Sequence, residues 1–384
     1  MSIAQIVLSD LHLGARDSLL THFHGGGEIA DGPGEVLLSF AHGLRETLSD
    51  GEKPQLVLLG DALDLGLSPF GDVSKSFLQL IDAFFPKDGR EIFRRDIVYV
   101  AGNHDHHLWR MAQDHRFITA LQAENGPWID FLWSDLGSAG DIGGAAGSLY
   151  QTMLSAGASH DFAESVARRI TGGLNSKLGI DPSMQLKYGI TLDNLLRAAV
   201  DLTAGRAAER QREGYGHVLG EAEIDDIGWY LGTPMAAQLR DELGELPSEL
   251  QFVFGHTHKP FQDELMVDGY ERPVGVFNTG GWVLDEPTLM PVQGCAAMLV
   301  SDDLEVASLR LFNDPTDGTM APVRVEGSGR VSRLVEETGA AVERAASHWS
   351  DFSRVVHARI VEEADARVRH LLETSEESLR EAAE

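Results

Sequence analysis

The sequence predicts an α/β fold in which helices cover a mostly parallel sheet. Three short apolar runs, residues 3–8, 55–59 and 96–100, each stop abruptly at a polar cluster, which is typical of buried strands. Helix-like stretches at residues 34–48 and 74–85 lie between these runs. Strands that alternate with helices form parallel sheets with both faces covered. We therefore expect the polar clusters to meet at the carboxyl edge of one sheet.

The strand pattern returns late in the chain, after a region of different character. Residues 137–249 are rich in Gly and Ala and then helical in pattern, and we interpret them as a helical insertion or cap. Residues 251–254 predict a strand, and 274–277, 296–301 and 305–311 predict closely spaced strands that are antiparallel in part. The predicted parts of the chain are therefore residues 1–136, the insertion at 137–249, residues 250–320 and a C-terminal helix at 330–384.

The C-terminal residues 330–384 predict a long, charged helix with one broad apolar face. This face carries Leu334, Val335, Val342, Trp349, Phe352, Val356 and Ile360. A stripe of this width most often packs on its own domain, which is the favoured interpretation. The alternative is a contact between copies in a homo-oligomer.

The amino-acid composition and net charge limit the kinds of molecule that the chain is expected to bind. The chain has 384 residues, of which 43% are hydrophobic and 24% charged, as in ordinary globular proteins. Its net charge is −29, from 60 acidic and 31 basic residues, which disfavours binding to nucleic acid or anionic membranes. The only cysteine, Cys295, lies in an apolar stretch and is expected to be a buried hydrophobic side chain.

The N-terminus has no basic start and no small-residue cleavage site of the kind found in signal peptides. No run approaches the roughly 20 apolar residues that span a bilayer. We therefore expect no membrane span and a cytoplasmic location.

Four predicted strand ends carry side chains that can bind metal ions. They are Asp10-Leu11-His12, Gly60-Asp61-Ala62-Leu63-Asp64, Gly102-Asn103-His104-Asp105 and Gly255-His256-Thr257-His258. Each motif alone also fits a solvated loop or a turn. Together they mix carboxylate, amide and imidazole donors, which suits a pair of ions such as Mn, Fe, Zn or Ni better than calcium or a structural zinc.

In residue type, order and strand context, these motifs resemble those of the calcineurin-like metallophosphoesterase family. The resemblance covers residues 1–125 and 250–312. It implies the family's layered αββα sandwich, here with the helical insertion and the long C-terminal helix added. The run Ser9-Asp10-Leu11-His12-Leu13-Gly14 is also similar to the bacterial branch that includes UDP-diacylglucosamine hydrolases.

The resemblance implies hydrolysis of a phosphoester by a hydroxide that bridges two divalent ions, with Mn expected first and Fe, Zn or Ni as alternatives. It implies that Asp10, His12 and His258 hold one ion, that Asn103 and His256 hold the other, and that Asp61 bridges both. His104 would protonate the leaving oxygen, and Asp64 would set the His104 tautomer. A turn-stabilising role is the alternative for Asp64.

The expected substrate is a small phosphorylated molecule, and a phosphodiester or nucleotide is favoured because His104 can assist an alkoxide leaving group. Two rival interpretations remain open. One is a degenerate scaffold that binds ligands without catalysis. The other is a nuclease of the same family, which the acidic composition disfavours.

One further histidine of the family pattern has no matching strand end here. It would lie between the Asn-His motif and the final histidine pair. His217 is the first candidate, with Tyr215 at that position in an alternative alignment, and His160 is the second. A third interpretation is that no such ligand exists, which would weaken binding of the second ion. Pocket-lining roles suit the histidines that follow the Asn-His motif better, namely His106, His107 and His115.

Overall fold

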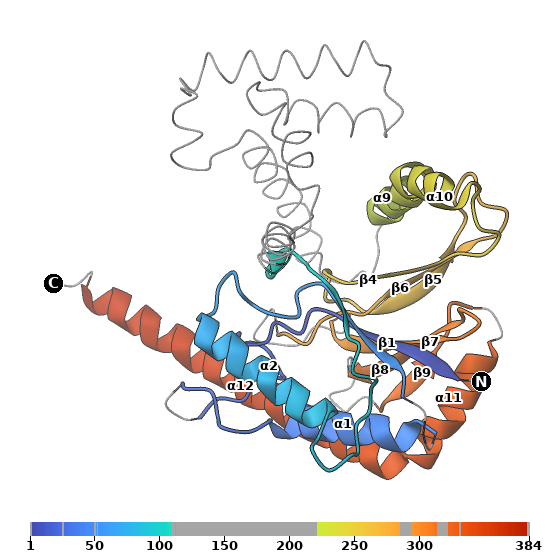
Figure 1. Cartoon of the computed structure of the whole chain (residues 1–384). Helices are drawn as coiled ribbons and strands as arrows, with labels where there is room; N and C mark the ends of the chain where they lie inside the picture. The colour runs from blue at the N-terminus through green and yellow to red at the C-terminus, as the bar shows by residue number, and fades with distance from the viewer. Residues whose placement is uncertain are drawn as a thin grey trace, which may run out of the picture.

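The structure is a computed structural model (Figure 1). It describes residues 2–24, 27–49, 51, 53–106, 108, 112, 221–284, 293–312, 322–329 and 332–381. The candidates His160 and His217, along with His107, His115 and most of the predicted insertion, lie outside the described residues. The described end of that range is helical and contains α9 (Glu221–Tyr230), the π-helical η1 (Leu231–Met235) and α10 (Ala236–Leu243).

The larger sheet has six strands among the described residues, in the order β3-β2-β1-β7-β8-β9. They are β1 (Ile3–Leu8), β2 (Gln55–Leu59), β3 (Val98–Val100), β7 (Cys295–Ser301), β8 (Val306–Phe312) and β9 (Arg324–Glu326). Strands β1, β2 and β3 are parallel, whereas β7, β8 and β9 are joined in antiparallel pairs. The predicted parallel start and partly antiparallel end of the domain are both confirmed.

The smaller sheet corrects one prediction. Strand β4 (Gln251–Phe254) pairs in parallel with β6 (Val274–Asn278), and β6 pairs antiparallel with β5 (Phe261–Leu265). The four motif-bearing strands therefore belong to two sheets and not to one. The sequence analysis missed β5 because its centre is polar, and only its terminal Phe261 and Leu265 are buried.

The two sheets pack face to face between helices, which confirms the αββα sandwich (Figure 1). Alternation along β1 shows the layering: Ile6 and Leu8 face the helices, whereas Val7 packs with Phe277 of the smaller sheet. Leu231 of η1 packs against the outer face of the smaller sheet. The helices that cover the larger sheet are α1 (Glu35–Thr47), α2 (Phe70–Phe84), α11 (Arg333–Arg344) and α12 (Ala346–Glu381).

The C-terminal region contains a long helix, as predicted, but a second, shorter helix precedes it. Helix α11 ends at Ala345, whose carbonyl accepts hydrogen bonds from the backbone N–H groups of His348 and Trp349 and so begins α12. The apolar face packs on the chain's own core, as favoured. Trp349 is buried, and its Nε1 donates to Oγ1 of Thr47 on α1 at 2.9 Å.

Cys295 is buried and free, as expected. Among the helices of the described residues, none combines the length and the apolar composition that a bilayer span requires.

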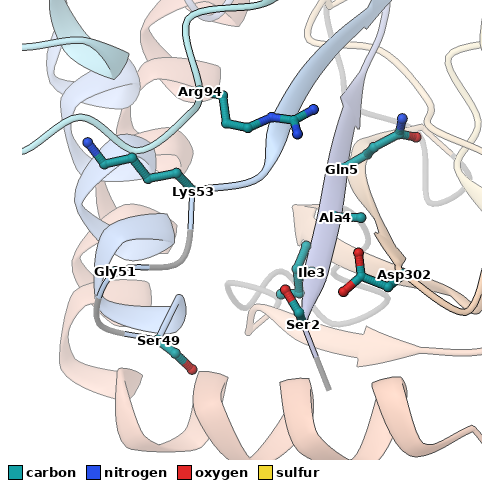
Figure 2. A pocket seen from close by; sticks show the side chains of 9 residues that line it. All are labelled: Ser2, Ile3, Ala4, Gln5, Ser49, Gly51, Lys53, Arg94 and Asp302. Atoms are coloured by element: carbon teal, nitrogen blue, oxygen red, sulfur yellow. The ribbon is translucent and has the colours of Figure 1, made fainter.

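A pocket of about 540 Å³ opens at the amino ends of β1 and β2, away from the metal-binding motifs (Figure 2). Lys53 and Arg94 contribute its positive charge. Both are paired with carboxylates, because Lys53 Nζ lies 2.9 Å from Glu91 and Arg94 lies 3.3 Å from Asp96. With its two cations already neutralised, the pocket is a poor anion site.

Candidate metal centre

The loops that follow β1 and β2 continue the parallel pairing of the two strands. The backbone N–H of Asp10 donates to the Gly60 carbonyl at 3.1 Å, and that of His12 donates to the Asp61 carbonyl at 2.9 Å. Backbone hydrogen bonds thus hold the two loops in register. This register brings the first two motifs together at the carboxyl edge of the larger sheet, as the sequence predicted.

Five of the predicted metal-binding residues have a left-handed backbone. Their φ angles lie between 45° and 77°, and the residues are Asp10, His12, Asp61, His256 and His258. Residues other than glycine rarely adopt this conformation, which costs on the order of 1–3 kcal/mol each and is concentrated at functional sites. The backbone conformation that places these side chains at the site therefore lowers the stability of the folded chain.

The predicted ligands form overlapping groups whose donor atoms lie within 4.8 Å of one another. One group contains Asp10, His12 and His258, and a second contains Asp10, Asp61 and His256. A third joins His12 to His104 and Asp64. We call these seven residues the metal centre. Because Asp10 belongs to two groups, two ions bound here would lie close together.

The sixth predicted ligand, Asn103, is exposed at the rim of the metal centre. It lies between Gly102 and His104, both of which contact Asp61. Its own carbonyl oxygen is 2.9 Å from Nδ1 of His106. The exposed His106 therefore lies at the same rim.

Burial and donor chemistry fit a divalent cation. Asp10, His12, Asp61 and His258 are each at most 5% exposed. The Nε2 atom of His12 is buried and has no hydrogen-bond partner among the described residues. Within the described part of the chain, the ion pairs of Asp10 and Asp61 are with His258 and His256, not with Lys or Arg. A cation stabilises buried carboxylates that are surrounded by imidazoles, and a bound metal ion would supply that charge.

The electrostatics of the metal centre favour deprotonated ligands. Burial, with His258 nearby, lowers the pKa of His12 to about 4, so this imidazole is neutral at pH 7. Burial alone would raise the pKa of Asp61, but the His256 ring and the His104 backbone N–H outweigh it, and the pKa falls to about 2. A neutral imidazole and an ionised carboxylate are the forms that bind metal ions.

His104 and Asp64 form the pair that the resemblance implied. Nδ1 of His104 lies 2.7 Å from Oδ1 of Asp64, and Ser68 donates its hydroxyl to Oδ2 of the same carboxylate at 2.5 Å. Burial raises the pKa of Asp64, but these two hydrogen bonds outweigh it, so the pKa is lowered. An ionised Asp64 holds the Nδ1–H tautomer of His104, which leaves Nε2 to meet a substrate.

Asp105 has a role that the sequence analysis did not assign. It is fully buried, and its carboxylate accepts hydrogen bonds from the backbone N–H groups of Ala62, Leu63 and Gly102 and from the Tyr99 hydroxyl. Burial, together with Asp105, raises the pKa of Tyr99 and keeps it protonated. Asp105 therefore ties the Asp61 loop to the Asn103 loop. The motif Gly102-Asn103-His104-Asp105 gave its position but not these contacts.

Two glycines make room for the central carboxylates. A Cβ on Gly255 would overlap Oδ2 of Asp10 and the hydroxyl of Ser9, and a Cβ on Gly102 would overlap Oδ1 of Asp61. The Ser9 hydroxyl also contacts both Asp10 and Thr279. Backbone and carboxylate thus approach more closely than any other residue type allows.

One family of known proteins matches the part of the chain that carries the metal centre. A family model described as calcineurin-like phosphoesterase matches residues 5–260 of the chain. This match begins in β1 and ends just after the final histidine pair, so it includes every predicted ligand. A search of curated proteins found no match.

Proposed function

Because the chain belongs to the calcineurin-like phosphoesterase family, we propose that it hydrolyses a phosphoester with two divalent metal ions. The observation that carries the proposal is the buried Nε2 of His12, which has no hydrogen-bond partner among the described residues, in a side chain grouped with Asp10 and His258. A bound cation would give this buried imidazole nitrogen a partner. Manganese is the ion we propose first, with Fe, Zn or Ni as alternatives.

In this proposal the residues divide their work between binding and proton transfer. Asp10, His12 and His258 would hold one ion, Asn103 and His256 the other, and Asp61 both. When bound, the ions would neutralise charge on the phosphoryl group and lower the pKa of a water molecule. The backbone N–H of His104 contacts the Asp61 carboxylate, and that of His256 contacts the Asp10 carboxylate. These contacts keep the carboxylate oxygens in place before substrate arrives.

His104 is the proposed general acid. Asp64 accepts its Nδ1–H, which directs Nε2 toward the substrate and stabilises the protonated ring. A proton held at Nε2 can pass to the leaving oxygen as the P–O bond breaks. Only a basic leaving group needs this help, so the pair favours alkyl phosphodiesters and nucleotides. Independently of the leaving group, the run Ser9 to Gly14 supports a UDP-linked substrate as the first nucleotide to try.

The test is hydrolysis of an aryl phosphodiester, an aryl phosphomonoester and UDP-diacylglucosamine by metal-free protein and by protein supplied with Mn²⁺. We expect manganese-dependent turnover that is lost in Asp61→Asn and strongly reduced in His104→Ala. Asp303→Asn and His357→Ala are matched controls, because both residues lie outside the metal centre. Protein that binds two ions but turns over none of these substrates would favour the rival, a binding scaffold without catalysis.

A further inference from the structure

A second group of metal-binding side chains lies outside the metal centre. His42 and Glu46 are one helical turn apart on α1, and His348 lies in the first turn of α12. Their donor atoms are within 4.8 Å of one another. Nε2 of His42 is 3.8 Å from Oε1 of Glu46, and the two imidazole rings have centroids 4.5 Å apart. We call these three residues the interhelical cluster.

The packing beneath the interhelical cluster fixes the two helices side by side (Figure 1). Trp349, next to His348, lies against Gly43, where an added Cβ would come within 2.7 Å of the indole ring. Trp349 is 2% exposed and also donates to Thr47. The backbones that carry the cluster are therefore held by a buried tryptophan, whereas His42 and Glu46 keep the freedom of exposed side chains.

The cluster also contains an unsatisfied polar atom. Nδ1 of His348 is buried and has no hydrogen-bond partner in the described part of the chain. A buried imidazole nitrogen without a partner destabilises the folded state. A cation between the two rings and Glu46 that took Nδ1 of His348 as a ligand would remove this cost.

We propose that His42, Glu46 and His348 bind a zinc ion that joins α1 to α12. Two imidazoles and one carboxylate form a familiar three-ligand set for zinc, whose fourth position is filled by water. Bonds of about 2.0–2.2 Å place tetrahedral donor atoms about 3.3 Å apart, and a small rotation of the exposed side chains closes the observed 3.8 Å. The excess of acidic residues adds a long-range attraction for cations. This site does not depend on the proposed phosphoesterase activity.

The test counts zinc ions bound by metal-free full-length protein and follows thermal unfolding with added zinc. We expect His42→Ala and Glu46→Gln each to bind one zinc fewer than wild type and to lose part of the zinc-dependent rise in Tm. Both side chains are about half exposed, at 54% and 47%, so both variants should fold. Manganese-dependent turnover should not change, because neither residue belongs to the metal centre.

His357→Ala is the matched control, because it removes a histidine of α12 outside the cluster. It should bind as much zinc as wild type. The same zinc count and the same rise in Tm in wild type, His42→Ala and Glu46→Gln would overturn the proposal. An equal loss in His357→Ala would also overturn it, since binding would then be nonspecific.

Discussion

The backbone N–H of His256 lies 2.9 Å from each carboxylate oxygen of Asp10. Asp10 follows β1 of the larger sheet and His256 follows β4 of the smaller one, so this contact joins the two sheets at the metal centre. The contact is possible only because Gly255 lacks a side chain that would overlap the Asp10 carboxylate. The position of Asp10 therefore depends on a residue nearly 250 positions later in the chain.

Gly255→Ala should displace Asp10 and reduce the metal content of the protein, with the fold retained. The added methyl would overlap the Asp10 carboxylate, which the His256 backbone N–H holds, and the Ser9 hydroxyl, which contacts Asp10 and Thr279. Metal analysis after dialysis against Mn²⁺, together with circular dichroism, checks this. Gly71→Ala is the control, because a Cβ there would have no described atom within 4 Å. Full metal content in Gly255→Ala would contradict the geometry of the site.

His104→Ala should lower kcat by about 10²- to 10⁴-fold, the usual contribution of a general acid. The loss should be larger for an alkyl leaving group than for 4-nitrophenolate, which leaves without a proton. Asp64→Asn should lower kcat by about 10- to 100-fold, because it removes the carboxylate that orients His104. Steady-state kinetics on paired substrates measures both effects. Equal losses for both leaving groups would argue against proton transfer by His104.

Asp105→Asn should lower the free energy of unfolding by about 3 kcal/mol. The carboxylate accepts from three backbone N–H groups and from Tyr99, and an amide group would turn a donor toward some of these donors. Urea unfolding of metal-free protein measures the loss. Asp263→Asn on the exposed centre of β5 is a control expected to change little. A change below about 1 kcal/mol would show that these contacts are not structural.

The stability of metal-free protein should fall as the pH falls from 6.5 to 4. The unfolded chain takes up a proton on His12 near pH 6.5, whereas the folded state resists it until pH 4, so protons favour unfolding in this window. A pKa shift of this size corresponds to about 3 kcal/mol of folding stability, which is fully present above pH 6.5 and is lost as the pH falls to 4. Asp61 adds a second loss between about pH 4 and 2, because its folded pKa is lowered. Urea unfolding across this range, with chelator present, should show a shallower decline between pH 6.5 and 4 in His12→Asn than in His357→Asn.

Gly43→Ala should destabilise the chain by about 1–3 kcal/mol, because the methyl would press on the buried Trp349 ring. The contact between α1 and α12 has no room for it. Gly339→Ala on α11 is the control, since no atom in the described part of the chain lies within 4 Å of a Cβ there and alanine favours helix. Urea midpoints compare the two variants. A Gly43→Ala protein as stable as wild type would mean that α12 is held by other contacts.

Local pattern in the sequence predicted most of the strands and the positions of the candidate ligands. An apolar run that stops at Asp10 or Asp61 marks the end of a buried strand, and this depends only on neighbouring residues. Which strands pair depends on distant residues. Strand β4 joins the smaller sheet because β6 and not β1 is its partner, and the run Gln251–Phe254 contains no sign of that choice.

Other features escaped prediction for the same physical reason. The polar β5 is a strand only because β6 supplies its hydrogen bonds. In the sequence, Asp105 stands in the same polar cluster as Asn103 and His104, so nothing local separates its role from theirs. Only the folded loops show that its carboxylate accepts hydrogen bonds from backbone N–H groups. The break at Ala345 interrupts a continuous helical pattern and becomes evident only from the hydrogen bonds of its carbonyl.

The strand order of the larger sheet has a consequence for synthesis on the ribosome. Strand β1 lies between β2, which is made early, and β7, which is made after about three quarters of the chain. Until β7 and β4 emerge, one edge of β1 stays open, and Asp10 lacks the backbone contact from His256. A nascent chain therefore cannot assemble this centre in stages. The protein should acquire its metal only after about three quarters of the chain has been made, when the exposed edge of β1 is already closed.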